Sequence, residues 1–265
     1  MARTSLAILV FLFFVTSVVG VVTGSNSLIT VPVMFQFGID EKVAVATNMF
    51  GLTFLSIGGT IPFVRSGQIE YRKLSPLVVL TLAGSAIGAA LVGLISNNGI
   101  KLIVSIAMIA VVIFTFFSGK SAESRPVGTS AGEVITRPNA SLNGPTSQLV
   151  VGFVATFLLA VYGGLYSGGY VTILTVAFVA FFGMTYSGAI AATKFVNVFS
   201  SAIATAIFMW QGLVDYRLGA ILAFTMFIGA FAGAHFVTKM DEVWLKRIFL
   251  ATVFLLAIKT LYDFL

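Results

Sequence analysis

The sequence carries one charged side chain deep inside an apolar stretch. Lys194 lies about two helical turns into the apolar run 187–209, in the segment Gly-Ala-Ile-Ala-Ala-Thr-Lys-Phe-Val-Asn. A buried ammonium is costly unless it is paired, and all nine acidic residues fall at or beyond the ends of the apolar runs. A bound anion would supply the missing counter-charge. The alternatives are that Lys194 snorkels to the membrane interface or donates to carbonyls freed by a broken helix.

Hydroxyl and amide side chains accompany this lysine. Thr193 and Asn197 lie beside it on the same stretch. With one residue inserted, an Ala-Thr pair that ends at Thr47 aligns with the pair that ends at Thr193, so Asn48 is the counterpart of Lys194. Neutral donors around one ammonium suit an oxyanion. The alternative for the threonines and asparagines alone is ordinary hydrogen bonding between helices.

Two short apolar pieces, 27–37 and 171–181, each follow a break rich in glycine and serine. At about 11 residues, each piece reaches only about half the bilayer. The unpaired N–H groups and the dipole at the start of such a half-helix form an anion site, and the alternative is a packing kink. Candidate binding residues at the breaks are Gly24, Ser25, Asn26, Gly168, Gly169 and Tyr170. Ser25 and Asn26 are also predicted to cap the first piece.

The rest of the sequence predicts an all-α integral membrane protein. Hydrophobic residues make up 58% of the chain and charged residues 9%, against about 25% charged residues in soluble domains. A surface that faces lipid needs no charge. Eight longer apolar stretches are predicted transmembrane helices: 5–22, 43–64, 75–95, 100–118, 147–165, 187–209, 218–238 and 245–264.

The eight spans form two copies of one unit. At an offset of 145 residues, glycine, tyrosine and lysine positions coincide: Gly24 with Gly169, Gly38 with Gly183, Gly67 with Gly212, Tyr71 with Tyr216, Gly84 with Gly229, Gly88 with Gly233 and Lys101 with Lys246. Residues 1–118 and 147–265 are therefore predicted four-span repeats, joined by a polar flexible linker at 119–146. Because an even number of spans returns the chain to its starting side, the two copies are expected to be parallel repeats, related by an axis along the membrane normal.

Charge and composition restrict the kinds of partner and cofactor that the protein is expected to bind. Basic residues at the ends of the spans indicate contact with the lipid bilayer, and their distribution predicts that both termini are cytoplasmic. The sequence has no cluster of basic residues interleaved with aromatic residues, so nucleic-acid binding is not expected. The sequence has no cysteine and one histidine, so no metal and no cofactor is expected. An intramembrane hydrolase would need a Ser/Lys dyad such as Lys194 with Ser200 or Ser201, which lie beyond direct reach along one straight helix. An enzyme is therefore not expected, and a non-transporting accessory subunit is the other alternative.

The motifs together resemble the TauE/SafE family of sulfite-exporter-like permeases. The resemblance rests on the break before Leu-Ile-Thr-Val-Pro, which ends at Pro32, on Gly38 with Ala-Val-Ala-Thr-Asn48, and on the loop 65–72, all of which recur in the second copy. It implies an eight-span permease of a prokaryotic cytoplasmic membrane that moves small anions such as sulfite, sulfonates or carboxylates. It leaves room for a coupling ion and a homodimer. The chain departs from the family where Ala177 occupies the place matching Pro32.

Overall fold

The described part of the chain is entirely helical. The computed structural model describes residues 3–24, 26–67, 69, 71–122, 146–239 and 244. Its helices are α1 (Arg3–Thr23), α2 (Ser27–Gln36), α3 (Glu41–Arg65), α4 (Tyr71–Leu94), α5 (Asn97–Ala122), α6 (Thr146–Leu165), α7 (Tyr170–Phe182), α8 (Tyr186–Trp210) and α9 (Tyr216–Val237). Within these residues, six helices are long and apolar enough to cross a membrane: α1, α3, α4, α6, α8 and α9.

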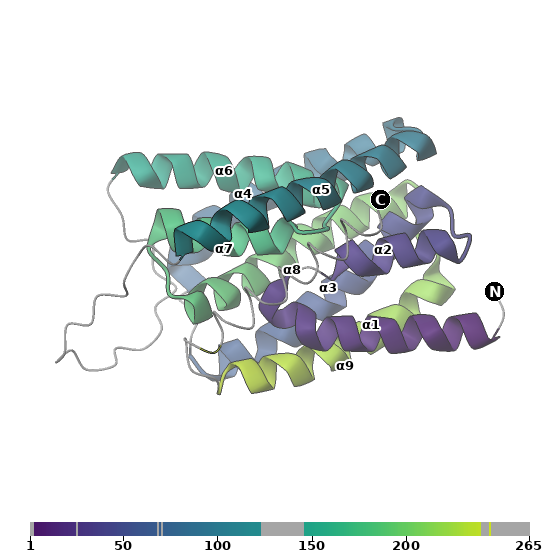
Figure 1. Ribbon diagram of the computed structural model, residues 1–265, viewed down its shortest axis with the longest axis horizontal. Helices are drawn as coiled ribbons and strands as arrows, with labels where there is room; N and C mark the ends of the chain where they lie inside the picture. Colours follow the sequence, from purple (N-terminus) through teal and green to yellow (C-terminus); the bar gives the residue numbers. More distant parts are fainter. Residues whose placement is uncertain are drawn as a thin grey trace.

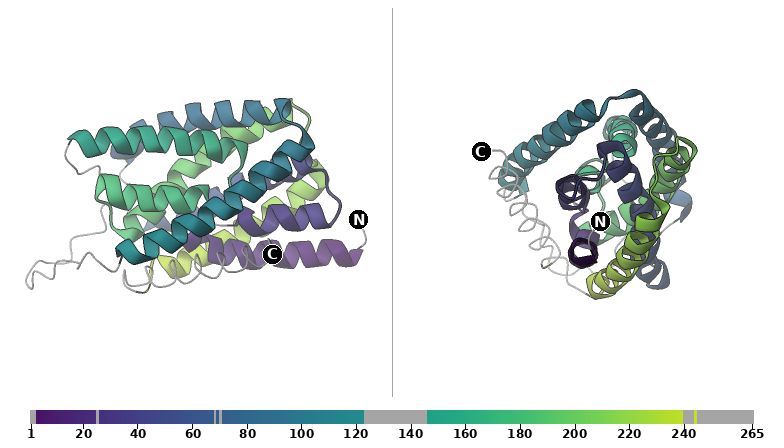
Figure 2. Two further views of the ribbon diagram at one scale, coloured as in Figure 1. Left: turned by 45° about the horizontal axis from the view of Figure 1, so that its top comes forward. Right: turned by 90° about the vertical axis from the view of Figure 1, so that its right-hand side faces the viewer.

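The predicted spans and short pieces agree with these helices wherever the structure describes them. The long helices run roughly along the long axis of the molecule, with α6 and α1 at opposite edges (Figure 1). Helix α5 crosses the others obliquely, as the turned view shows (Figure 2), and it continues past the predicted boundary at residue 118 to Ala122. The predicted span 245–264 and most of the predicted linker lie outside the described residues.

The two halves of the chain share one backbone pattern. Among the residues that the structure describes, six glycines have a positive φ, and they form three pairs separated by 145 residues: Gly24 and Gly169 (69° and 76°), Gly38 and Gly183 (74° and 66°), and Gly67 and Gly212 (70° and 70°). Helices α3 and α8 each contain 25 residues and begin and end at the same spacing. Left-handed backbone of this kind is cheap only for glycine, so these glycines fix the ends of equivalent helices.

This register differs from the predicted alignment in one respect. Because α3 and α8 have the same length and equivalent ends, no inserted residue is needed between them. Asn48 is therefore matched with Thr193, and Met49 is matched with Lys194. The short helices agree with this register: Thr30 of α2 bonds to Asn48 at 2.8 Å, and the equivalent Thr175 of α7 lies 3.4 Å from the Thr193 hydroxyl.

Helices α3 and α8 run in opposite directions. Thr53 bonds to Thr205 at 3.0 Å, whereas Ser56, further along α3, accepts from Asn197 at 2.7 Å, nearer to the start of α8. An axis along the membrane normal would leave two matched helices parallel, so the predicted parallel arrangement of the halves is wrong.

The reason lies in the short helix of the first half. Helix α2 turns back along α1, because Asn26 Nδ2 donates to Ser17 Oγ at 3.2 Å. The start of α1 and the end of α2 consequently lie at the same end of the molecule (Figure 1). A count of four spans per half omits this return along α2.

Glycines bring helices of different halves into close contact. Helix α9 packs on α1, where a Cβ at Gly229 would lie 2.9 Å from the Phe14 carbonyl oxygen and one at Gly233 would collide with the Val18 carbonyl. Helix α4 packs on α6 in the equivalent way, through Gly84 and Gly88. The first helix of each half therefore packs against a helix of the other half, at the small separation that only glycine permits.

Candidate functional site

The two helix breaks meet in the interior. Ser27 and Ser167, at the start of α2 and just before α7, share a hydrogen bond of 2.7 Å, and Tyr166 donates to the Ser27 carbonyl at 3.1 Å. A Cβ at Gly24 would lie 2.7 Å from Val171 Cβ. Because α2 and α7 occupy opposite ends of the molecule (Figure 1), their first turns approach each other from opposite directions. The positive ends of two half-helix dipoles thus converge.

Asn48 ties the first break to α3. Its Nδ2 donates to Ser27 Oγ at 2.8 Å, and its Oδ1 accepts from Thr30 Oγ1 at 2.8 Å. All three side chains are buried. Of the residues predicted from the sequence, Asn48 is therefore placed directly at the junction of the breaks.

Asn26 occupies the position before α2 but does not cap the helix with its side chain. Its amide nitrogen instead donates to Ser17 of α1, and its Oδ1 is buried without a hydrogen-bond partner. The predicted capping role of Asn26 is therefore wrong. Ser25, the other predicted cap, lies outside the described residues.

The second break is packed with tyrosines. The Gly168 carbonyl accepts a hydrogen bond from the Tyr162 hydroxyl, and Gly168 itself lies against the Tyr166 ring, where a Cβ would collide. Gly169 precedes α7 with a left-handed backbone and no side-chain cap. Tyr170 lies over Gly163, and its buried hydroxyl makes no hydrogen bond. Glycine is thus required here both for the turn and for the aromatic packing.

Lys194 reaches the first break from α8. Its side chain is 1% exposed, and Nζ donates to the Gly20 carbonyl at 2.9 Å. The same carbonyl accepts from the Gly24 N–H at 2.8 Å. Among the residues that the structure describes, no carboxylate forms an ion pair with Lys194. Burial contradicts the snorkelling alternative. The bond to Gly20 agrees with the other alternative in that Lys194 donates to a carbonyl near the break, but this carbonyl also keeps its helical partner, the Gly24 N–H.

Three predicted residues form hydrogen bonds that lead away from the breaks. Thr47 Oγ1 accepts from the Asp215 N–H at 3.0 Å, just before α9. Thr193 donates to the Ile190 carbonyl at 3.0 Å, within its own helix. Asn197 donates to Ser56 of α3. The bonds of Thr47 and Asn197 join the two halves, and a role of these three residues in substrate binding remains a prediction.

Sequence reasoning missed several residues of the junction. Ser27 and Ser167 lie inside the Gly/Ser-rich breaks, yet no local pattern indicates that they touch across 140 positions. Thr30 matches Thr175 at the repeat offset, which is a signal that the sequence did contain. Ser17 and Gly20 lie on the predominantly apolar helix α1, where no sequence pattern marks them as contact residues.

The Ser/Lys dyad of a hydrolase is not assembled. Ser200 bonds to Ser85, Ser201 donates to the Asn197 carbonyl, and Lys194 donates to α1 instead. Within the described residues, no group of three or more His, Asp or Glu side chains could hold a metal ion.

Long apolar helices around two broken helices define a class of protein. Irregular backbone inside a membrane is tolerated where it is buried in protein or lines a cavity, and broken helices of this kind are typical of secondary transporters. The chain is thus a multi-pass membrane protein with the architecture of a transporter.

Comparison with known proteins is consistent with this class. Residues 9–260 match the family described as Sulfite exporter TauE/SafE, so the chain belongs to that family. It is 24% identical to the probable membrane transporter protein ORF9 of a Sinorhizobium species, over 97% of this chain and 93% of the relative. The probable membrane transporter protein YfcA of Escherichia coli K12 is 25% identical, over 95% of this chain and 89% of the relative. No solved structure matches the chain.

Proposed function

We propose that the protein transports a small anion, namely a sulfur-containing oxyanion, a sulfonate or a small carboxylate, bound where the two breaks meet. The observation that carries this proposal is the buried ammonium of Lys194 at the first break, for which no described carboxylate supplies a counter-charge. A backbone carbonyl offers a dipole but no net charge. The bound anion would complete the neutralisation.

The surrounding groups suit an anion. An ammonium has three N–H donors, and Lys194 uses one of them on Gly20. Neither α2 nor α7 is capped by the side chain that precedes it, so both positive helix ends are available to a ligand. The proposed binding residues at the junction are Lys194, Asn48, Gly24, Asn26, Gly168, Gly169 and Tyr170, and Ser25 is proposed with them from its place in the sequence. Thr47, Thr193 and Asn197 are proposed to position the helices that carry them.

We also propose that the two halves are inverted repeats, with 245–264 as the last of eight apolar spans. The paired glycines and the equal lengths of α3 and α8 support the repeat. The antiparallel course of α3 and α8 supports the inversion, since an axis in the membrane plane reverses each matched helix. Anion-binding transporters with converging half-helices are built in this way.

The charges support an orientation that differs from the sequence-based expectation in the placement of the termini, which were expected to be cytoplasmic. Lys42 donates to the Gly93 carbonyl and Lys101 pairs with Glu41 at 2.7 Å, which places the start of α3 beside the start of α5. Gln211 bonds to the Ala90 carbonyl at the same end, so Arg217 lies there too, away from Arg65. The end with Arg65, Arg72, Lys73 and Lys120 also leads into the predicted polar linker, which contains Arg125 and Arg137. By the positive-inside rule we propose that this end is cytoplasmic, in a prokaryotic inner membrane, and that α1 begins outside.

A ligand screen followed by a flux assay tests the transport proposal. Purified protein in detergent is heated with sulfite, sulfate, thiosulfate, sulfoacetate, taurine, acetate or lactate, and a bound anion raises the melting temperature. The stabilising anion should then enter liposomes that contain the protein and not empty liposomes. Absence of both stabilisation and flux for every anion would favour the accessory-subunit alternative.

A further inference from the structure

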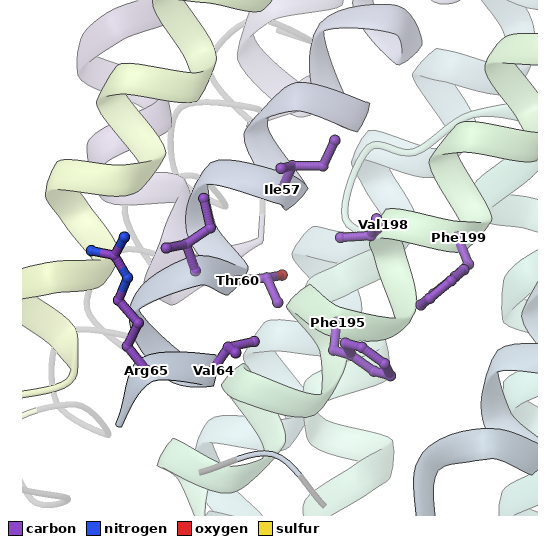
Figure 3. Close-up of a pocket in the computed structure, with 8 residues that line it drawn as sticks. Ile57, Thr60, Val64, Arg65, Phe195, Val198 and Phe199 are labelled. Carbon is purple, nitrogen blue, oxygen red and sulfur yellow. The ribbon is translucent and has the colours of Figure 1, made fainter. Parts of the chain in front are cut away.

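An open groove separates α3 from α8 at the end of the molecule that carries Arg65. Its volume is about 290 Å³. Ile57, Thr60 and Val64 of α3 face Phe195, Val198 and Phe199 of α8 across it (Figure 3). The Thr60 hydroxyl donates to the Ser56 carbonyl at 2.6 Å, so it offers no free polar group. The groove is therefore apolar along its length.

The opposite end of the same helix pair is closed. There Thr53 and Thr205 share a hydrogen bond of 3.0 Å across the two helices. At the repeat offset of 145, Thr205 corresponds to Thr60 and Thr53 corresponds to Val198. A valine thus replaces one partner of this interhelical hydrogen bond. The two helices are still joined on their buried side, where Asn197 donates to Ser56, and the groove lies beside that contact. The groove is a specific difference between two ends that share one backbone.

The groove ends at residues typical of the lipid headgroup region. Arg65 is exposed in the last turn of α3, and no described residue forms an ion pair with it. Its side chain extends away from Phe195 and Phe199 (Figure 3), which leaves the apolar channel open. Tyr71 packs on Phe195 with its ring centroid 5.3 Å away. Tyrosine and arginine are enriched where hydrocarbon meets headgroups, and arginine binds phosphate oxygens with paired donors.

We propose that this groove binds one acyl chain of an anionic phospholipid, whose phosphate contacts Arg65. The apolar lining matches a hydrocarbon chain, and the free guanidinium at its end matches the negative headgroup. The lipid takes the place between the two helices that the Thr53–Thr205 contact fills at the other end. It is a bound component of the protein, distinct from lipid that exchanges freely around it.

Native mass spectrometry of the whole protein, released from nanodiscs of phosphatidylglycerol or phosphatidylcholine, tests the proposal. The wild type should retain one phosphatidylglycerol and markedly less phosphatidylcholine. Val198→Phe fills the groove and should abolish retention, whereas Val154→Phe, at an exposed position of α6, should not. Arg65→Gln should lower phosphatidylglycerol retention about tenfold, the equivalent of one charge-assisted hydrogen bond. Arg217→Gln removes the same charge at the other end of the molecule and should leave retention unchanged.

Melting temperatures of all four variants show that they are folded. Equal retention of lipid by the Val198→Phe and Val154→Phe variants would overturn the groove as the site. Equal retention of the two lipids by the wild type would overturn the anionic headgroup, and hence the proposal as stated.

Discussion

At one and the same register, α3 carries Met49 and α8 carries Lys194. Both side chains are buried, at 2% and 1% exposure, and both stand next to a polar residue, Asn48 or Thr193, that faces a threonine of the half-helix. The backbones of the two halves agree to within a few degrees at their turning glycines. The shared backbone therefore builds two equivalent breaks, and the charge at one of them comes from a single side chain.

The difference teaches where symmetry is useful and where it is not. Two converging half-helices need the same turn twice, which glycine provides in each half. Two lysines in one buried centre would repel each other, at a cost that grows in a low dielectric. One ammonium and one thioether avoid this repulsion, and under the proposed function they leave a single positive charge for the anion.

The largest effect is expected in the labelling of single introduced cysteines, where each position should react either fully or not at all from one side of the membrane. This experiment tests whether the halves are inverted. The chain has no native cysteine, so each label reports one position. Gln36→Cys and Trp210→Cys should react with an impermeant maleimide from outside the cell, whereas Ser66→Cys and Thr185→Cys should react only after the membrane is opened. Labelling of Gln36→Cys and Thr185→Cys from the same side would restore the parallel arrangement.

The second largest effect is expected when Lys194 is replaced by methionine, the residue type at the matching position of α3. Lys194→Met gives α8 the residue of α3, removes the charge and keeps much of the volume. We expect transport to fall about a hundredfold, the equivalent of a lost charged hydrogen bond at the upper end of its range, and anion-induced stabilisation to disappear. Lys194→Arg should retain the charge but transport poorly, because a planar guanidinium does not fit a site built for an ammonium.

The matched change Met49→Leu should leave transport close to that of the wild type. The decisive control is the amount of folded protein in the membrane. Normal anion flux through well-folded Lys194→Met would remove Lys194 from the binding site.

A pair of glycine substitutions separates backbone strain from contact between the breaks. Gly24 and Gly38 both have left-handed φ, but a Cβ at Gly24 would strike Val171, whereas one at Gly38 would meet nothing within 4 Å. Gly38→Ala should cost about 1–2 kcal/mol of stability from the backbone alone. Gly24→Ala should cost about 1–3 kcal/mol more from overpacking. Equal losses in thermal or denaturant unfolding would mean that the breaks do not touch.

The smallest expected effect concerns the hydrogen bond between the breaks. Ser167→Ala removes a buried hydrogen bond between the two halves and Thr53→Val a partly buried one, so each should cost about 1 kcal/mol of stability. Only Ser167→Ala should change the apparent KM for the anion, because Thr53 lies on the α3–α8 contact and not at the junction. Identical kinetics for the two variants would argue against binding at the breaks.

The sequence predicted features that depend on local composition. Gly/Ser-rich segments before short apolar pieces gave the two breaks, and the isolated Lys194 gave a buried charge. Prediction from the sequence was wrong for features that depend on contacts between residues far apart in the chain. The direction of the second half follows from the return of α2 along α1, which no count of apolar stretches reveals. The hydrogen bond that Thr47 accepts from the Asp215 N–H joins residues 168 positions apart, and no local pattern predicts it.

The packing of α1 on α9 and of α4 on α6, across the two halves, has a consequence for biosynthesis. Helix α1 is made first, but its close glycine-lined neighbour is α9, the last complete helix described. Helix α4 is likewise made before its close neighbour α6. The first half therefore leaves the ribosome with two packing faces that only lipid can cover, and it becomes a folded unit when the second half arrives. We expect residues 1–122 expressed alone to be degraded, and to be rescued by co-expression of residues 146–265.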